Sequence, residues 1–574
     1  MVRTVSFFPP LLASILGAAA FAQTPVVGWS GENMRLRSAN VTPAGGTAFN
    51  LTLTMENDNN NAGLPTSFRR WWHCEIGALN PAGTTLTITI ANAGYSDVIL
   101  PVWARSSDGG QSFTAYERMP VSAVPTQPSG SSHRFTIATP PGVDTIRIAK
   151  YFPYTVTRKD AFVAGLASHP HVRSITTIGQ SRQGRPLELI ELTDATVPDA
   201  GKTRVWIHTA VHPAETTSYF VTEGLIAWLG SGDPYAEVLL DQTIFDIVPM
   251  ANPDGVWLGN YRTNAASVNL ENEWGSPYNS AEPEIIAMRT AIEGFMGTPS
   301  APGSNPITVV LNLHSSHDVS YPFHFRHTAN ANWSPTGNNS GVIPAVNALE
   351  TDWINHFRAA SPFVALGATQ SSSAGAPSRP FVESMMHDRW SAVSQWTGAP
   401  AFEEPVMAIT FEGTYRYGPQ SGVWNTEADY ELCGAQMGRA FADYYGATPT
   451  ASITAYGQPC TALYLNGTVS PLPQGGNQVL LTFVNADPSA VAFLALGFQS
   501  AATPLPSPWQ SCLSRTSVDA SVFVPVNPLG FGQWPTTLPA ISGLGLYAQA
   551  VTFVFGTGGV VVDTSNGADV RNAW

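Results

Sequence analysis

Hydrophobic and polar residues alternate in short runs from residue 24 to about residue 150. Two examples are FNLTLTMEN (49–57) and TLTITIANA (85–93), and turn sequences such as NPAG (80–83) separate the runs. Alternation with a period of two is typical of strands with one buried face, and Pro and Gly mark the turns between them. Because five or more such runs occur without a helical pattern, residues 23–154 are predicted to form a β-sandwich domain.

The pattern changes between residues 155 and 446. Apolar runs such as TRVWIHTAV (203–211) and ITVVLNLH (307–314) alternate with stretches of helical periodicity at 216–229, 281–295 and 344–359. Buried strands that alternate with helices are typical of an α/β domain. The predicted fold class is therefore α/β, with a mixed, largely parallel sheet and helices on both faces.

The helical pattern ends after residue 446. Short strand-like runs return, among them TALYLNG (461–467) and AVTFVFGTGGVVVD (550–563). Residues 447–574 are therefore predicted to form a third, all-β domain, an accessory module to which the sequence assigns no chemistry.

The first 22 residues have the features of a secretory signal peptide. Arg3 gives the positive end, the segment from Phe7 to Ala19 is mainly apolar, and AFA (20–22) is a small-x-small cleavage site. A membrane anchor is the alternative, but the apolar run is short and is interrupted by two prolines. No later segment has about 20 uninterrupted apolar residues. We therefore expect an exported protein, secreted or periplasmic, without a membrane span.

Charge and cysteine content narrow the possible partners and the compartment. The formal net charge is −14, which argues against a nucleic acid partner. The four cysteines fit an oxidising compartment. Cys460 and Cys512 share the C-terminal region and are expected to form a disulfide. Cys74 and Cys433 lie in different predicted domains, and a bridge and two buried free thiols are equally acceptable there.

Polar residues with metal-binding chemistry fall at the ends of predicted strands in the middle region. His212 and Glu215 follow RVWIHTA, His314 ends ITVVLNLH, and Glu412 follows VMAITF. Sites in such sheets form beyond the carboxyl ends of the strands. His212 and Glu215 are expected on one side of the first turn of the following helix. Two His and one Glu can bind one zinc ion and leave a position open for water, whose proton a separate carboxylate such as Glu412 can accept.

Each of these residues has a simpler interpretation. An isolated H-x-x-E motif is common by chance, and His317 competes with His314 as the third ligand. Glu412 could form an ion pair with Arg416, and His208 is expected to be a core residue. The position of all four ligand and base candidates at strand ends favours the metal site. Motifs of other enzyme classes, such as H-E-x-x-H and G-x-S-x-G, do not occur.

The order of several motifs in the middle region resembles the zinc carboxypeptidases, the carboxypeptidase A-like metallopeptidases. The similar segments are GQSRQGRPLELIEL (179–192), VHPAETTS (211–218), PMANPDGVWLGNYR (249–262), VNLENEW (268–274), EPE (282–284), LNLHSSH (311–317) and ITFEGTY (409–415). The resemblance covers residues 155–446 and is strongest to the cytosolic carboxypeptidase branch. FRRWWHCEIGAL (68–79) and RIAKYFPYT (147–155) are similar to the β-sandwich that precedes those catalytic domains.

The resemblance implies roles for individual residues. His212, Glu215 and His314 would bind one Zn²⁺ per chain, and Glu412 would be the general base. Arg262 would polarise the scissile carbonyl and stabilise the oxyanion, a task suited to a guanidinium group.

Two departures from the family pattern affect the substrate pocket. Where the family has an Asn-Arg pair that binds the substrate's terminal carboxylate, this chain has Glu271 and Asn272. These two are the substrate-binding candidates, and Arg289, Arg326 or Arg389 could supply the missing cation. The family's mobile tyrosine is also missing, because no Tyr occurs between Tyr321 and Tyr415. Trp390 lies in about the right stretch but lacks a phenol.

The predicted function is hydrolysis of peptide bonds near protein or peptide C-termini by a zinc-dependent metallocarboxypeptidase. The alternatives are another zinc amide hydrolase on the same scaffold, such as a deacylase or a cell-wall peptidase, and an inactive peptide- or glycan-binding homologue. A general base at Glu412 argues against the inactive homologue, because a binding protein does not need one.

Overall fold

The computed structural model describes the chain from residue 23 to residue 571 with short gaps. The described ranges are 23–298, 301–317, 319–330, 341–367, 369–372, 380–391, 404–418, 422–448, 451–472, 476–539, 545–557 and 559–571. The predicted signal peptide lies outside them. Contacts group the chain into two compact units, one running to Thr155 and including Gly255–Val268, the other formed by Val156–Asp254 and the chain from Asn269 onward.

The first unit contains two five-stranded sheets, as the alternating pattern predicts. One has the order β1-β4-β10-β6-β7 and the other β2-β3-β5-β9-β8. Alternate residues of β5, such as Leu86, Ile88 and Ile90, are fully buried, while the residues between them are not. The strands are β1 (Val26–Gly28), β2 (Ser38–Gly45), β3 (Ala48–Thr54), β4 (His73–Gly77), β5 (Thr85–Ala91), β6 (Val102–Ser106), β7 (Glu117–Arg118), β8 (Thr126–Ser129), β9 (Ser132–Ala138) and β10 (Thr145–Ala149).

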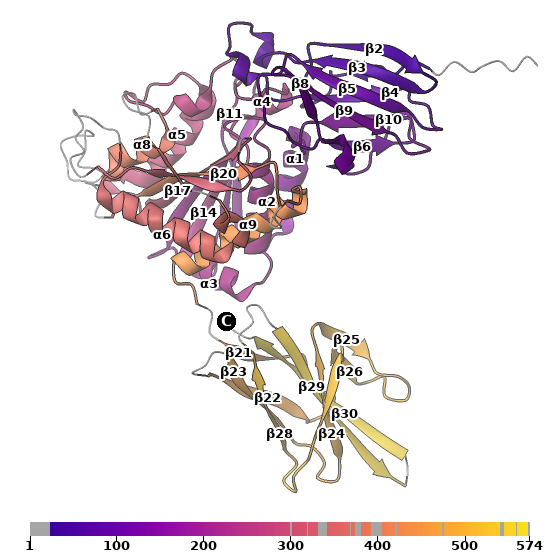
Figure 1. The fold of residues 1–574 in the computed structure, drawn as a ribbon. Helices are drawn as coiled ribbons and strands as arrows, with labels where there is room; N and C mark the ends of the chain where they lie inside the picture. Colours follow the sequence, from indigo (N-terminus) through magenta and orange to yellow (C-terminus); the bar gives the residue numbers. More distant parts are fainter. Residues whose placement is uncertain are drawn as a thin grey trace, which may run out of the picture. The chain divides into compact units, whose positions relative to one another are not determined.

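The second unit is built on an eight-stranded mixed sheet (Figure 1) with the order β11-β12-β14-β13-β17-β20-β18-β19. The central strands β14, β13, β17 and β20 are parallel to one another. Strand β12 is antiparallel to both β11 and β14, and β18 is antiparallel to β20. The strands are β11 (Val172–Gln180), β12 (Pro186–Leu192), β13 (Thr203–Thr209), β14 (Thr243–Val248), β17 (Ile307–Ser316), β18 (Phe323–His327), β19 (Gln370–Ser372) and β20 (Met407–Thr414).

Helices cover both faces of this sheet. The helices are α1 (Val156–Gly165), α2 (Thr217–Leu229), α3 (Pro234–Gln242), α4 (Pro253–Trp257), α5 (Pro283–Met296), α6 (Pro344–Ala360), α7 (Pro362–Ala365), α8 (Val382–Met386) and α9 (Glu427–Tyr444). On one face Trp206 of β13 shares a core with residues of α5 and α8. On the other face Phe411 of β20 packs on Phe357 of α6, and Phe245 of β14 packs on Phe441 of α9. The three helices predicted at 216–229, 281–295 and 344–359 agree with α2, α5 and α6 within two residues.

Helices α2 and α9 approach each other closely at two glycines. A methyl group at Gly224 would lie 2.0 Å from the carbonyl oxygen of Glu431, and one at Gly434 would lie 2.0 Å from that of Val221. Only a residue without a side chain allows the two backbones to pack at this distance.

The C-terminal part of the second unit is all-β, as predicted. Its strands form the sheets β21-β30-β29-β24-β27, β22-β23-β28 and β25-β26, with a core that includes Leu465, Leu481 and Leu494. They are β21 (Ser452–Tyr456), β22 (Tyr464–Pro471), β23 (Asn477–Val484), β24 (Val491–Gly497), β25 (Ser500–Pro504), β26 (Leu513–Thr516), β27 (Ala520–Val524), β28 (Gly532–Leu538), β29 (Gly545–Gly556) and β30 (Gly559–Arg571).

The cysteines separate into one bridge and two thiols. Cys460 and Cys512 form the predicted disulfide. Cys74 and Cys433 are buried free thiols, so the alternative of a bridge between them is wrong.

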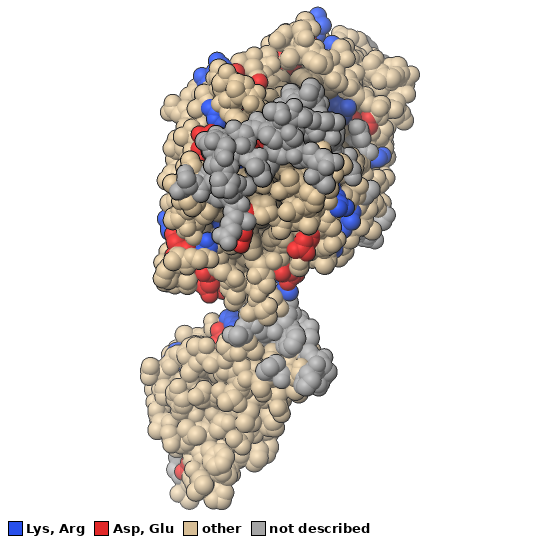
Figure 2. All heavy atoms as spheres, turned by 90° about the vertical axis from the view of Figure 1, so that its left-hand side faces the viewer, with Lys and Arg blue, Asp and Glu red and all other residues tan. Residues whose placement is uncertain are grey.

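Charged side chains are sparse on one face of the all-β part formed by β21 to β30. In the view of Figure 2 its surface is almost entirely formed by uncharged residues, whereas Lys, Arg, Asp and Glu side chains are spread over the rest of that face. No helix in the described ranges combines the length and apolar character needed to cross a bilayer.

Candidate metal centre

The turn between β13 and α2 carries two of the three candidate metal ligands. The strand ends at Thr209, and Ala210 then takes a left-handed backbone conformation with φ of 67°. His212 and Glu215 follow in a turn closed by the hydrogen bond from the Glu215 amide to the His212 carbonyl, 3.2 Å. Helix α2 begins only at Thr217, so the expectation that both residues lie on its first turn is wrong. Both side chains therefore come from the turn that precedes the helix.

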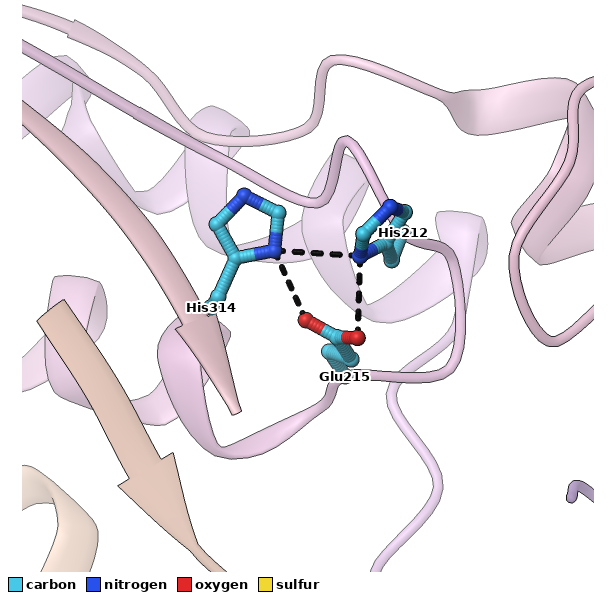
Figure 3. Close-up of side chains that lie close together, drawn as sticks. All are labelled: His212, Glu215 and His314. Carbon is cyan, nitrogen blue, oxygen red and sulfur yellow. Dashed lines mark hydrogen bonds and ion pairs between the residues drawn. The ribbon is translucent and has the colours of Figure 1, made fainter. Parts of the chain in front are cut away.

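His212, Glu215 and His314 converge on one buried point (Figure 3). The Nδ1 atom of His212 lies 2.9 Å from Oε1 of Glu215, and the Nδ1 atom of His314 lies 2.8 Å from Oε2. The two Nδ1 atoms are 3.1 Å apart. Each of the three side chains is at most 4% exposed as a residue. The fold therefore brings the three predicted ligands together.

The other ring nitrogen of each histidine faces an oxygen acceptor. Nε2 of His212 lies 3.0 Å from Oδ1 of Asn269, and Nε2 of His314 lies 3.2 Å from Oε2 of Glu271. A neutral imidazole carries one proton, so these acceptors place it on Nε2 and leave the lone pair of Nδ1 directed at the shared point. Two lone pairs and two carboxylate oxygens at one point repel each other unless a cation lies between them. The donor set thus fits a zinc ion, which prefers His nitrogen and Glu oxygen ligands.

The electrostatics of the cluster lead to the same conclusion. Burial raises the pKa of Glu215, but the neighbouring His212 and His314 outweigh it and hold the pKa well below its usual value. Burial lowers the pKa of His314, yet the charges of Glu271 and Glu215 raise it well above the usual value. The site therefore strongly favours a positive charge, which a bound metal ion supplies as readily as a proton.

Glu412 lies beside the cluster in the sheet. It is half-buried on β20 and pairs in register with His314 on the parallel neighbour β17. Side chains of register partners on neighbouring strands lie on the same face of a sheet. The proposed base is therefore one strand away from a candidate metal ligand.

Arg262 lies on the segment Gly255–Val268, which packs within the first unit. Asp58, in the short 3₁₀ turn Asp58–Asn60, holds the backbone of this loop. Its carboxylate accepts the backbone N–H groups of Tyr261, Arg262 and Thr263 at 2.7, 2.8 and 2.8 Å. Burial raises the pKa of Asp58, and the three N–H groups and Arg35 act in the opposite direction. The β-sandwich thus fixes the loop that carries the arginine.

The two substrate-binding candidates have different surroundings. Glu271 is buried and contacts His314 and Asn312, whereas Asn272 is exposed. The three arginines considered as replacement cations are engaged elsewhere: Arg289 and Arg389 with Glu293, and Arg326 with Asn347.

Sequence reasoning missed two side chains beside the candidate ligands. Asn269 stands in the segment VNLENEW (268–274), and its Oδ1 atom faces His212. Glu383 of α8 is buried and accepts hydrogen bonds from Asn312, at 3.5 Å, and from Thr410. Burial and the nearby charge of Glu271 raise the pKa of Glu383. No motif surrounds Glu383 in the sequence, so only the fold brings it to this place.

Three other residues singled out from the sequence lie outside the cluster. His317 stacks on Tyr415, with ring centroids 4.6 Å apart. His208 accepts a hydrogen bond from Trp206 Nε1 at 3.1 Å within the core, as expected for a structural histidine. Trp390 is fully buried in the core cluster with α5 and does not replace the missing tyrosine.

Two His and one Glu are the three protein ligands found at the zinc ion of several hydrolases. Residues 160–361 match the zinc carboxypeptidase family, so the chain carries a domain of that family. This result confirms the resemblance found in the sequence.

Similar proteins include cytosolic carboxypeptidases and bacterial metallo-carboxypeptidases. The mouse protein Cytosolic carboxypeptidase 6 is 36% identical over 176 residues, which are 30% of this chain and 32% of that protein. A metallo-carboxypeptidase structure from Burkholderia cenocepacia has a TM-score of 0.54 at 23% identity and covers 74% of this chain and 99% of its own. A metallo-carboxypeptidase structure from Pseudomonas aeruginosa has a TM-score of 0.55 at 19% identity, with 74% and 99% coverage. The chain thus spans about a third of the curated relative and shares its fold with the solved structures.

Proposed function

We propose that this protein is a zinc-dependent metallocarboxypeptidase that hydrolyses a peptide bond near the C-terminus of a peptide or protein. The observation that carries the proposal is the buried convergence of His212, Glu215 and His314 one strand away from Glu412. The family match over residues 160–361 supports it.

Each residue has one task in the proposed reaction. His212 and His314 through Nδ1, and Glu215 through its carboxylate, would hold the zinc ion. When bound, zinc supplies Lewis acidity that makes water a better nucleophile at neutral pH. The Glu412 carboxylate accepts a proton from the attacking water, whose oxygen bonds to the scissile carbonyl carbon. The resemblance to the zinc carboxypeptidases implies that the guanidinium of Arg262 would donate hydrogen bonds to the carbonyl oxygen as negative charge develops on it. The C–N bond then breaks, and Glu412 delivers the proton to the leaving amine.

The decisive experiment changes Glu412 to Gln, which keeps the size of the side chain and removes the proton acceptor. Zinc content should stay at one per chain, while kcat on a peptide substrate falls about 10²–10⁴-fold. The matched control is Glu404→Gln, because Glu404 is an exposed glutamate shortly before β20 and its loss should leave kcat unchanged. Equal turnover of wild type and Glu412→Gln would remove Glu412 as the base.

The missing Asn-Arg pair gives a second candidate function a specific basis. A zinc amide hydrolase such as a deacylase or cell-wall peptidase has no need to bind a free terminal carboxylate. Cleavage of acylated or amidated peptides, with no cleavage of any free-terminus peptide, would favour this candidate.

We also propose that the protein is exported to a secreted or periplasmic location. The disulfide between Cys460 and Cys512 supports an oxidising compartment. Sequencing the N-terminus of the mature protein should give Gln23 as the first residue, and a mature chain that begins at Met1 would contradict export.

A further inference from the structure

One short turn provides an acceptor for both histidines of the candidate metal centre. The 3₁₀ turn Leu270–Asn272 begins with Asn269, whose Oδ1 atom accepts the Glu271 amide at 3.2 Å and faces Nε2 of His212 at 3.0 Å. Two residues further on, Glu271 faces Nε2 of His314. The two histidines therefore have unlike partners, a neutral amide oxygen and a carboxylate.

The carboxylate of Glu271 is held at both oxygens. Oε2 lies 3.2 Å from His314 Nε2, and Oε1 accepts the side-chain amide of Asn312 at 3.0 Å. Asn312 and His314 are two residues apart on β17, so their side chains lie on the same face of the strand and meet one carboxylate together. Glu271 is 7% exposed, and in the described ranges its only ion-pair partner is His314.

We propose that Glu271 is a positioning residue of the metal centre rather than part of the substrate pocket. It accepts the Nε2–H of His314, which holds the imidazole ring in place and keeps the lone pair of Nδ1 available to the metal. The proposal rests on the proposed zinc site. A ligand histidine with a carboxylate partner is a stronger and better oriented donor, and loss of such a partner typically weakens metal binding 10–100-fold.

The test measures zinc affinity by competition with a chromophoric chelator, without any peptide. Glu271→Ala should bind zinc about 10–100-fold more weakly than wild type. Glu271→Gln keeps an acceptor oxygen without the charge, so its affinity should lie between the two. The matched control is Asn272→Ala at the exposed neighbouring position, which should bind zinc as wild type does. Thermal unfolding of the metal-free variants shows whether each is folded.

Cobalt(II) gives a readout that a merely structural role would not change. The visible absorption bands of the cobalt-loaded protein should shift in Glu271→Ala and stay at the wild-type positions in Asn272→Ala, because the bands report ligand geometry. Wild-type zinc affinity in both Glu271 variants would overturn the proposal. A raised KM with unchanged zinc affinity would also overturn it, by assigning Glu271 to substrate. Wild-type protein that shows the expected zinc affinities but cleaves no peptide would reject the proposed function and leave this role of Glu271 intact.

Discussion

The close crossing of α2 and α9 allows a sharp prediction for Gly224→Ala. The added methyl carbon would lie 2.0 Å from the Glu431 carbonyl oxygen, and ordinary contact begins at 3.4 Å, so the two backbones must separate by about 1.4 Å. Overpacking of this kind costs roughly 1–3 kcal/mol, and the upper part of the range applies because a backbone atom cannot rotate away. The higher helix propensity of Ala offsets at most about 1 kcal/mol of this cost. A net loss of about 2 kcal/mol in the free energy of unfolding is expected.

Gly294→Ala is the matched control for this prediction. Gly294 lies in the last turn of α5, is exposed, and has no atom within 4 Å of the position of an added methyl carbon. Only the propensity term applies there, so this variant should be more stable by about 0.5–1 kcal/mol. Urea unfolding of both zinc-loaded variants measures the two values. The reasoning is refuted if Gly224→Ala is as stable as wild type while Gly294→Ala gains stability. Because α2 begins two residues after Glu215, Gly224→Ala should also weaken zinc binding.

Three further predictions concern the metal, pH and the substrate's terminus. Elemental analysis should find one zinc per chain, lost in His314→Ala and retained in His317→Ala; the reverse result would move the third ligand. Burial lowers the pKa of His324 to about 3. As the pH falls through 6.5, the His324 side chain is protonated in the unfolded chain but stays neutral in the folded protein. The free energy of unfolding therefore falls by up to about 1.4 kcal/mol for each pH unit below 6.5. His324→Phe, next to Phe357 and Phe411, should flatten the fall in unfolding free energy between pH 7.5 and 5; an unchanged slope would contradict this. Wild type should cleave peptides with a free C-terminal Phe poorly compared with the same peptides ending in an amide, because no arginine in the described ranges replaces the family's carboxylate-binding one. In Asn272→Arg, kcat/KM for the peptide with a free C-terminal Phe should rise about ten- to hundredfold, since a charge-assisted bidentate contact contributes about 1.5–3 kcal/mol. Fastest cleavage of the Phe peptide by wild type, without gain in the variant, would reject this account of the pocket.

The metal cluster was predictable because its signals are local. His212, Glu215 and His314 each stand at the end of an apolar run, and parallel strands bring such ends together whatever the details of packing. The turn that carries His212 and Glu215 ahead of α2 was not predictable, because the left-handed backbone at Ala210 depends on tertiary contacts. The contacts of Glu271 could not be predicted from the sequence either, since its partners lie about 40 residues away on β17. A substitution pattern can indicate that a family contact is lost, but only the fold shows which contact replaces it.

The hold of Asp58 on the loop that carries Arg262 has a consequence for how this protein is inherited. The segment Gly255–Val268 comes after α1, α2 and α3 in the chain, so the first unit has its complete set of contacts only when this part of the α/β domain is also present. The segment Gly255–Val268 packs with the β-sandwich, for example through the hydrogen bond from the Arg262 amide to Asp58. The β-sandwich therefore depends on a segment that belongs to the α/β domain in sequence. The N-terminal domain is therefore not an exchangeable appendage. Recombination that replaced the N-terminal domain would remove the Asp58 carboxylate that binds the backbone of the loop carrying Arg262. The two domains are therefore expected to be inherited together.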